Sequence, residues 1–126
     1  MSWLLAEIEW PAGSRWRLGD RRTRYPESAP ANYGHLPGSH NPADGSEVDA
    51  VVLGPSLPAG RRVRGRLVGM IALADGDHKL ILCRHGHPRP GEIARVLSWF
   101  PPERRPRFAP AHRAKAWLWG KLGREG

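Results

Sequence analysis

Glycine and proline occur all along this chain of 126 residues, and they limit what it can fold into more than any other feature. The 15 glycines and 13 prolines are more than a helical bundle tolerates, because both residue types interrupt regular helix. A chain of this length fits one domain with one modest core. We therefore predict one domain over residues 1–126, built from short strands and many turns, with residues 105–126 as a candidate loosely packed tail.

Short alternating or apolar segments predict the strands. Residues 62–68 alternate basic side chains with small or apolar ones, which is the period of a half-exposed strand, and this strand can continue toward Leu73. The other candidates are short runs that end at Pro or Gly or follow an acidic stretch. Between residues 11 and 43, frequent Pro, Gly, Ser and Asn favour turns and short extended pieces. The segments predicted as strands are residues 4–10, 48–53, 62–68 and 79–83.

The C-terminal part of the chain has a helical character. Residues 92–99 suit a short helix that ends before Pro101 and Pro102. Residues 101–110 are rich in Pro and Arg, and we expect them to be irregular. A last helix over residues 111–122 would bury one apolar face, formed by Trp117, Leu118 and Leu122.

Cysteine content and the N-terminus indicate a cytoplasmic protein. Cys83 is the one cysteine, so an intrachain disulfide is excluded, and it lies in an apolar run that favours a buried thiol. The first residues carry no basic group and turn acidic at Glu7, unlike a signal peptide. No apolar stretch reaches the ~20 residues that a membrane span needs.

Charge is unevenly distributed. The chain carries 20 Lys and Arg against 12 Asp and Glu, a net charge of +8, which favours anionic partners such as phosphates. It has five aspartates, and four of them lie in a first acidic turn, residues 44–49, and a second acidic turn, residues 75–79. Clustered carboxylates repel unless a cation neutralises them. Mg²⁺ is the natural candidate, because it prefers carboxylate oxygens.

The spacing in the second acidic turn supports a metal site. If the chain is extended there, Asp75, Asp77 and Lys79 share one face, so two carboxylates could hold a metal while the ammonium contacts a phosphate on that metal. Asp44 and Asp49 could converge on the same ions. The competing interpretation is a polar hairpin and a capped turn, which either stretch alone would favour.

Other groups that could bind phosphate lie upstream. Five arginines fall between residues 15 and 24, and guanidinium groups match phosphate oxygens in bidentate fashion. Tyr33 supplies a phenol that could donate to phosphate. The competing interpretations are a solvated charge run and a tyrosine on a barrel rim. Zinc at His85 and His87 is not favoured, since their spacing is not diagnostic and no cysteine partner exists.

Five segments together resemble one family, the soluble inorganic pyrophosphatases of the Mg²⁺-dependent type common in bacteria. Asp-Gly-Ser-Glu-Val-Asp at 44–49 resembles that family's signature Asp-Gly-Asp-Pro-(Leu/Val)-Asp, and Asp-Gly-Asp-His-Lys-Leu at 75–80 resembles its Asp-x-Lys metal segment. Further matches in register are Ile-Glu-Trp-Pro-Ala-Gly-Ser-Arg at 8–15, Pro-Ala-Asn-Tyr-Gly at 30–34 and Arg-Gly-Arg-Leu-Val-Gly at 64–69.

The resemblance implies a mainly β fold: a small closed five-stranded barrel of the oligonucleotide-binding type, with one or two short C-terminal helices. It implies hydrolysis of pyrophosphate by a metal-activated water, with Mg²⁺ as cofactor and pyrophosphate or phosphate as ligand. Bacterial-type members form hexamers, so a homo-oligomer stays open. The implied metal ligands are Asp44, Asp49, Asp75, Asp77 and Glu9; the implied substrate-binding residues are Arg17, Arg21, Tyr33 and Lys79; and Asp49 is implied as catalytic.

Two departures from the family pattern concern catalysis. Ser46 stands at the position of the family's base for the attacking water, and Glu47 beside it would point the opposite way on an extended chain. A phosphate-binding Tyr-Lys pair aligns with Phe100 and Pro101. Three hypotheses remain: a slow pyrophosphatase, a non-catalytic relative that binds phosphate-rich ligands or a partner, and a basic nucleic-acid-binding barrel. The last expects aromatic residues between the arginines at 62–66, and there are none.

Overall fold

The computed structural model describes residues 2–14, 29–39 and 46–125, with side chains as far as Trp119. Most of this part of the chain is strand and turn, with two helices near the C-terminus. A short 3-10 turn, η1 (Pro102–Arg104), joins the first helix to the last strand. The elements are β1 (Trp3–Trp10), β2 (Asn32–His35), β3 (Asp49–Leu53), β4 (Arg62–Ala72), β5 (Lys79–Cys83), α1 (Glu92–Trp99), β6 (Arg107–Pro110) and α2 (Ala111–Glu125).

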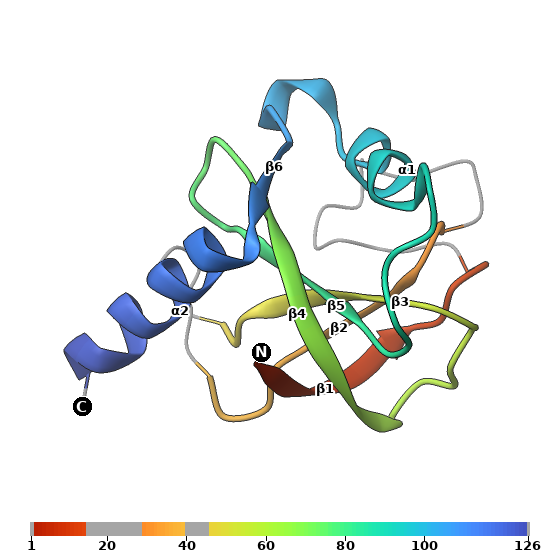
Figure 1. The fold of residues 1–126 in the computed structure, drawn as a ribbon, viewed down its shortest axis with the longest axis horizontal. Coiled ribbons are helices and arrows are strands. Elements are labelled where there is room, and N and C mark those ends of the chain that lie inside the picture. The colour runs from red at the N-terminus through yellow and green to blue at the C-terminus, as the bar shows by residue number, and fades with distance from the viewer. Residues whose placement is uncertain (1, 15–28, 40–45, 126) are drawn as a thin grey trace.

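Five strands close into a barrel (Figure 1). The strands follow the order β1-β2-β3-β5-β4, and a further pairing between β1 and β4 completes the ring. Only β3 and β5 run parallel among these pairs; the other pairs are antiparallel. β6 extends the sheet beyond β4. The predicted fold class, a mainly β closed five-stranded barrel with C-terminal helices, is confirmed.

The strand predictions are confirmed with small shifts at their ends. β4 alternates as expected, with Arg62 and Arg64 exposed between the buried Val63 and Gly65. β5 is buried along its whole length, because it lies between β3 and β4 and is covered on both faces. The strand β2 lies in the segment expected to hold short extended pieces. It approaches β1 so closely that a Cβ atom at Gly34 would lie 2.0 Å from the carbonyl oxygen of Glu7, so only glycine fits there.

Two apolar clusters cover the two faces of the β3–β5 pair. One fills the barrel interior, where Ala50 and Val52 of β3 meet Leu80 and Leu82 of β5. The other lies under α1, where Val51 and Ile81 from the opposite face meet Val96 and Trp99. Because side chains alternate along a strand, Asp49 and Lys79 share the face that α1 covers. Cys83 is buried on this same face, as expected for a structural thiol.

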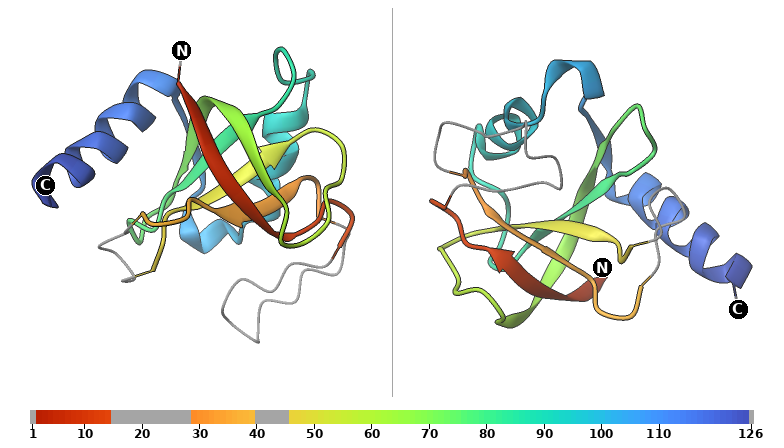
Figure 2. Two further views of the ribbon diagram at one scale, coloured as in Figure 1. Left: turned by 90° about the horizontal axis from the view of Figure 1, so that it is seen from below. Right: turned by 180° about the vertical axis from the view of Figure 1, so that it is seen from behind.

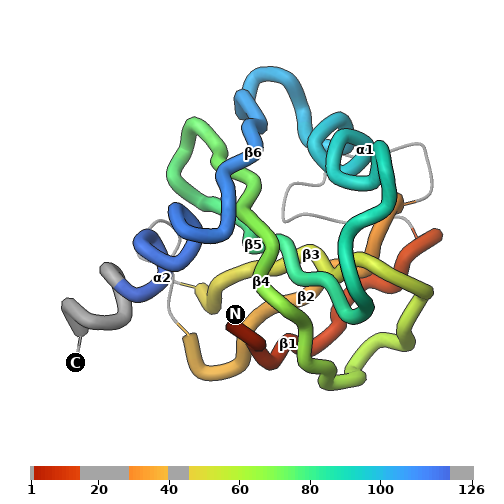
Figure 3. Tube along the Cα trace, viewed as in Figure 1, coloured from red at the N-terminus to blue at the C-terminus, as the bar shows by residue number. Residues whose placement is uncertain are grey.

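The C-terminal third differs from prediction in one segment. α1 spans the predicted residues, but the expectation that residues 101–110 are irregular is wrong. They contain η1 and then β6, which pairs with β4 through Met70 and Ala109 (Figure 3). α2 follows directly and projects from the barrel as one continuous helix (Figure 2). Its Leu118 is buried as predicted and Trp117 is only partly buried, while the side chain of Leu122 lies outside the described residues.

Candidate active site

The first residues of β3 and β5 carry the central contact of the site. Asp49 and Lys79 are register partners in the parallel pair, 30 residues apart in sequence. The Nζ atom of Lys79 donates to Asp49 Oδ2 at 2.6 Å and to Asp77 Oδ2 at 2.7 Å. Lys79 is only 3% exposed, so its ammonium is held between two carboxylates that are themselves largely shielded from solvent. Burial of a cation requires such partners.

The second acidic turn presents its two carboxylates together. Gly76 adopts a φ of 80°, which lets the chain reverse between Asp75 and Asp77 without strain. The backbone N–H of Asp77 donates to Asp75 Oδ1 at 3.0 Å, forming an Asx turn. Asp75, Asp77 and Lys79 thus lie together, as their spacing predicted.

Arg104 of η1 also reaches this turn, and sequence reasoning missed it. Its Nη2 lies 3.0 Å from Asp75 Oδ2 and 3.7 Å from Asp77 Oδ2. Burial alone would raise the pKa of Asp75, but the hydrogen bond from the Asp77 amide and the charge of Arg104 outweigh it, so this pKa lies below its usual value. A Pro/Arg-rich segment gave no signal that one arginine would turn inward.

Tyr33 lies beside Asp49 in a buried position. Burial, then the charge of Asp49 and a hydrogen bond with its carboxylate, raise the pKa of the Tyr33 phenol well above 10.0. The charges of Asp77 and Glu9 act in the same direction. The phenol therefore stays protonated at any physiological pH and can act as a hydrogen-bond donor.

The neighbours of Tyr33 in the sequence explain the rest of its motif. Asn32 is completely buried, and its amide oxygen accepts from the backbone N–H groups of Ala12 and Leu57, both at 2.9 Å. Its amide nitrogen donates to the carbonyl oxygens of Val52 and Pro55. Asn32 therefore ties β2 to β3 and to the segments at Ala12 and at residues 55–57, and this holds Tyr33 in place.

Glu9 belongs to a neighbouring cluster centred on His35, which sequence reasoning also missed. His35 Nδ1 lies 3.2 Å from Glu9 Oε2, and His35 Nε2 lies 3.6 Å from Glu7 and 3.5 Å from Glu47. Glu47 Oε2 also accepts a hydrogen bond from the Gly38 amide at 2.5 Å. Glu47 is therefore committed to contacts that hold the β2–β3 connection, and it offers no replacement for the acid missing at Ser46, which is exposed.

Three predicted site residues, Asp44, Arg17 and Arg21, lie outside the described residues. Within the described residues, no three His, Cys, Asp or Glu side chains form a group arranged to hold a metal ion. The three aspartates that do lie together offer hard oxygen donors, which suit a hard divalent cation, and Lys79 now bridges two of them. The donor chemistry of Asp49, Asp75 and Asp77 therefore suits such a cation.

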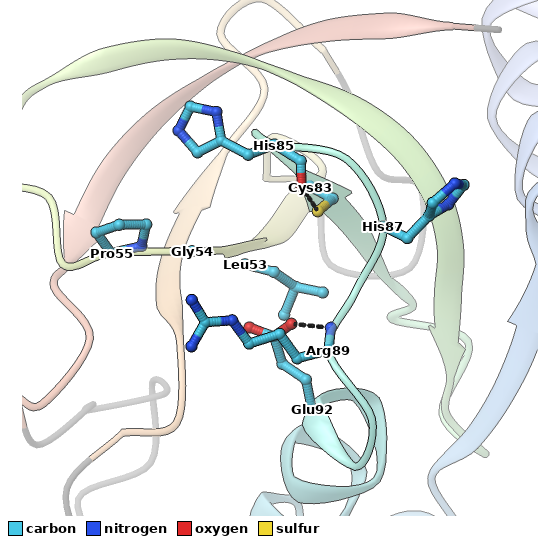
Figure 4. A pocket seen from close by; sticks show the side chains of 8 residues that line it. All are labelled: Leu53, Gly54, Pro55, Cys83, His85, His87, Arg89 and Glu92. Atoms are coloured by element: carbon cyan, nitrogen blue, oxygen red, sulfur yellow. Dashed lines mark hydrogen bonds between the residues drawn. The ribbon is translucent and has the colours of Figure 1, made fainter.

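A hollow of about 370 Å³ lies elsewhere on the barrel (Figure 4). Leu53 and Cys83, the last residues of β3 and β5, line it, so it lies at the end of this pair opposite to Asp49 and Lys79. The rings of His85 and His87 point in different directions there, which gives no support to a zinc site. The remaining lining residues are Gly54, Pro55, Arg89 and Glu92.

Comparison with known proteins agrees with the fold described above. The most similar solved structures include the inorganic pyrophosphatase of Helicobacter pylori, with a TM-score of 0.80 and 23% identity over 99% of this chain and 95% of that one. The enzyme of Thermus thermophilus gives 0.77 and 19% over 98% and 92%, and that of Neisseria gonorrhoeae gives 0.76 and 19% over 97% and 90%. At these identities the likeness shows the fold.

A sequence family gives the assignment that the structures alone do not. No curated protein matches the chain by sequence. No helix in the described part of the chain is long and apolar enough to cross a membrane. The family model described as inorganic pyrophosphatase matches residues 9–107, which is most of the chain. The resemblance drawn from the motifs is thereby confirmed, together with the hydrolase class and the need for a divalent metal that the family implies: this chain belongs to the inorganic pyrophosphatase family.

Proposed function

We propose that this chain hydrolyses inorganic pyrophosphate to two phosphates, with Mg²⁺ as its divalent ion. The observation that carries the proposal is the convergence of Asp49, Asp77 and Lys79, which come from separate strands and turns. Asp75 lies next to them through Arg104. We assign metal binding to Asp44, Asp49, Asp75 and Asp77, with Glu9 at the edge of the cluster. The proposed phosphate-binding residues are Arg17, Arg21, Tyr33 and Lys79.

Each described side chain has a role that follows from its chemistry. When bound, Mg²⁺ supplies a water of lowered pKa and offsets the charge of the pyrophosphate oxygens. Lys79 brings a fixed ammonium to one phosphoryl oxygen, and its two carboxylate partners hold it in orientation. Tyr33 donates from a phenol that stays protonated. Because Ser46 offers no base, we assign the proton lost by the attacking water to the Asp49 carboxylate, which is a poorer base since it already accepts from Lys79.

Ser46 makes slow turnover the expected behaviour. A hydroxyl is a poor base at neutral pH, and Glu47 is engaged with His35 and Gly38. Loss of a positioned general base typically costs about 10²–10⁴-fold in rate. The metal and the positioning groups still contribute, so we expect measurable turnover well below that of a complete site.

The direct test is phosphate release from pyrophosphate at high enzyme concentration, with Mg²⁺ and with EDTA. We expect release only with Mg²⁺, and none from the Asp77→Asn variant, which loses one carboxylate and one partner of Lys79. Zn²⁺ and Ca²⁺ in parallel reactions establish whether Mg²⁺ is preferred. Tight binding of pyrophosphate without any metal-dependent release would establish the non-catalytic hypothesis instead.

We also propose that the enzyme is cytoplasmic and that it self-associates. One buried free thiol, Cys83, agrees with a reducing compartment such as the cytoplasm. Self-association has support from four large apolar side chains that stay exposed, Trp3, Leu5, Phe108 and Trp119. Sedimentation velocity over a range of protein concentrations measures the oligomeric state, and a strictly monomeric protein would exclude the oligomer.

A further inference from the structure

Arg104 occupies a fixed position at the edge of the acidic cluster. Its carbonyl oxygen accepts from the Ala74 amide at 2.8 Å, and its own amide donates to Pro101 at 3.0 Å. The guanidinium lies over the Phe100 ring, 5.8 Å from its centroid. The backbone and the side chain of Arg104 are therefore both held in place. A solvated arginine side chain would lack the contact with the Phe100 ring.

The contacts of Arg104 with the aspartates use one edge of its guanidinium. Nε donates to Asp75 Oδ2 at 3.1 Å, and Nη2 lies 3.0 Å from the same oxygen. A guanidinium has five N–H donors in a rigid fork, so this contact engages only part of its capacity. The side chain of Arg104 is 23% exposed, so an anion can approach it from solvent.

The charges in the cluster indicate how a divalent cation would change the contacts of Arg104. Asp49, Asp75 and Asp77 carry three negative charges, and Lys79 and Arg104 carry two positive ones. A guanidinium and a divalent cation repel each other, so both cannot stay on Asp75 Oδ2 at low energetic cost. A cation on the Asp75 and Asp77 oxygens therefore leaves a guanidinium beside it without its carboxylate partner. Such a pair of positive groups is a binding site for a phosphoryl oxygen.

We propose that Arg104 is a substrate-binding residue, which exchanges Asp75 for a phosphoryl group of pyrophosphate when a divalent cation takes the carboxylates. The proposal rests on the proposed function of this site. Arg104 and Lys79 both contact Asp77 but come from η1 and β5, so they would hold the anion from two directions. The alternative is a purely structural ion pair that fastens η1 to the second acidic turn.

The two interpretations differ in how Arg104→Gln affects metal and anion binding. We would measure by calorimetry the binding of Mg²⁺ alone, and then of imidodiphosphate, a non-hydrolysable analogue, at saturating Mg²⁺. We expect the analogue to bind about 10- to 100-fold more weakly, the range for a lost hydrogen bond to a charged group. Mg²⁺ alone should bind as tightly as in the wild type or more tightly, because a competing cation is gone.

Two control variants separate an effect of the Arg104 guanidinium from a general loss of positive charge. Arg107→Gln removes the same charge from an exposed position three residues away and should change neither affinity. Arg104→Lys keeps the charge without the fork and should recover part of the anion affinity. Unchanged analogue binding in Arg104→Gln, or a joint loss of Mg²⁺ and analogue binding, overturns the role of Arg104 and leaves the proposed function standing. A wild-type protein that fails to bind the analogue overturns both.

Discussion

Asp49 and Lys79 lie opposite each other at the start of two parallel strands, and a hydrogen bond of 2.6 Å joins their side chains. The same ammonium also contacts Asp77, so one buried cation holds together a carboxylate of β3 and one of the second acidic turn. Lys79 therefore does for the aspartates, in the absence of metal, what a divalent cation would do in its presence. Stability and metal binding should be linked through this residue.

Lys79→Met should make the stability of the protein depend on divalent metal. Without the ammonium, Asp49 and Asp77 repel each other, and we expect a loss of about 1–3 kcal/mol in the free energy of unfolding. Mg²⁺ should recover much of this loss and raise the melting temperature of the variant more than that of the wild type. Thermal unfolding with and without Mg²⁺ measures both effects.

The control for that prediction is Lys115→Met. Lys115 lies on α2, where its ammonium lies 6.0 Å from the centroid of the Trp119 ring. Its replacement should leave the response to Mg²⁺ as in the wild type. An equal drop in melting temperature for Lys79→Met at saturating Mg²⁺ and in EDTA would contradict the link.

Asp49→Asn should abolish metal-dependent phosphate release. The substitution removes a proposed metal ligand and proton acceptor, and it leaves Lys79 with Asp77 as its remaining carboxylate partner among the described residues. We expect a fall in rate of at least about 10²-fold. The matched control is Glu103→Gln, which makes the same acid-to-amide change at an exposed position of η1. Survival of activity in Asp49→Asn would show that the metal assignment is wrong.

Ser46→Asp should raise turnover. It adds a carboxylate three residues before Asp49, at the position of the family's base, and one more negative charge for the metal. If the rest of the site is intact, we expect a gain of about 10²-fold or more in the rate of phosphate release. Ser56→Asp, at another exposed serine, should change nothing. A variant at Ser46 without any gain would locate the defect elsewhere, with Phe100 and Pro101 as the first candidates.

The raised pKa of Tyr33 predicts a loss of stability at alkaline pH. The unfolded chain releases the phenolic proton near pH ~10, whereas the folded protein retains it to higher pH. The contribution of Tyr33 is therefore complete below about pH 10 and falls as the pH rises toward the folded-state value. Chemical unfolding at pH values from about 9 to about 11.5 should show a steeper decline for wild type than for Tyr33→Phe.

The barrel strands and the acidic site were predictable for different reasons. The alternation at residues 62–68 and the apolar run at 79–83 follow directly from burial on one face or on both. Asp49, Asp77 and Lys79 were found because the few aspartates of this basic chain cluster in two short stretches of the sequence. In each case a local pattern in the sequence reports a local physical requirement.

The parts that escaped prediction depend on contacts distant in sequence. β6 is only four residues of Arg, Phe, Ala and Pro, and it is a strand because β4 provides an edge for it. Arg104 is one of several arginines in its segment. It contacts Asp75 because η1, the turn after α1, places it there. His35 gathers Glu7, Glu9 and Glu47 from β1 and from the segment before β3, which no spacing reveals.

The parallel pairing of β3 with β5 has a consequence for how this enzyme acquires its activity. Parallel neighbours cannot be joined by a tight hairpin, so β4 must first run out and return before Lys79 can meet Asp49. The contact between Asp49 and Lys79 is therefore non-local, and a folding chain forms such contacts slowly. In a refolding or newly synthesised molecule, we therefore expect hydrolysis to begin only after β3 and β5 have paired.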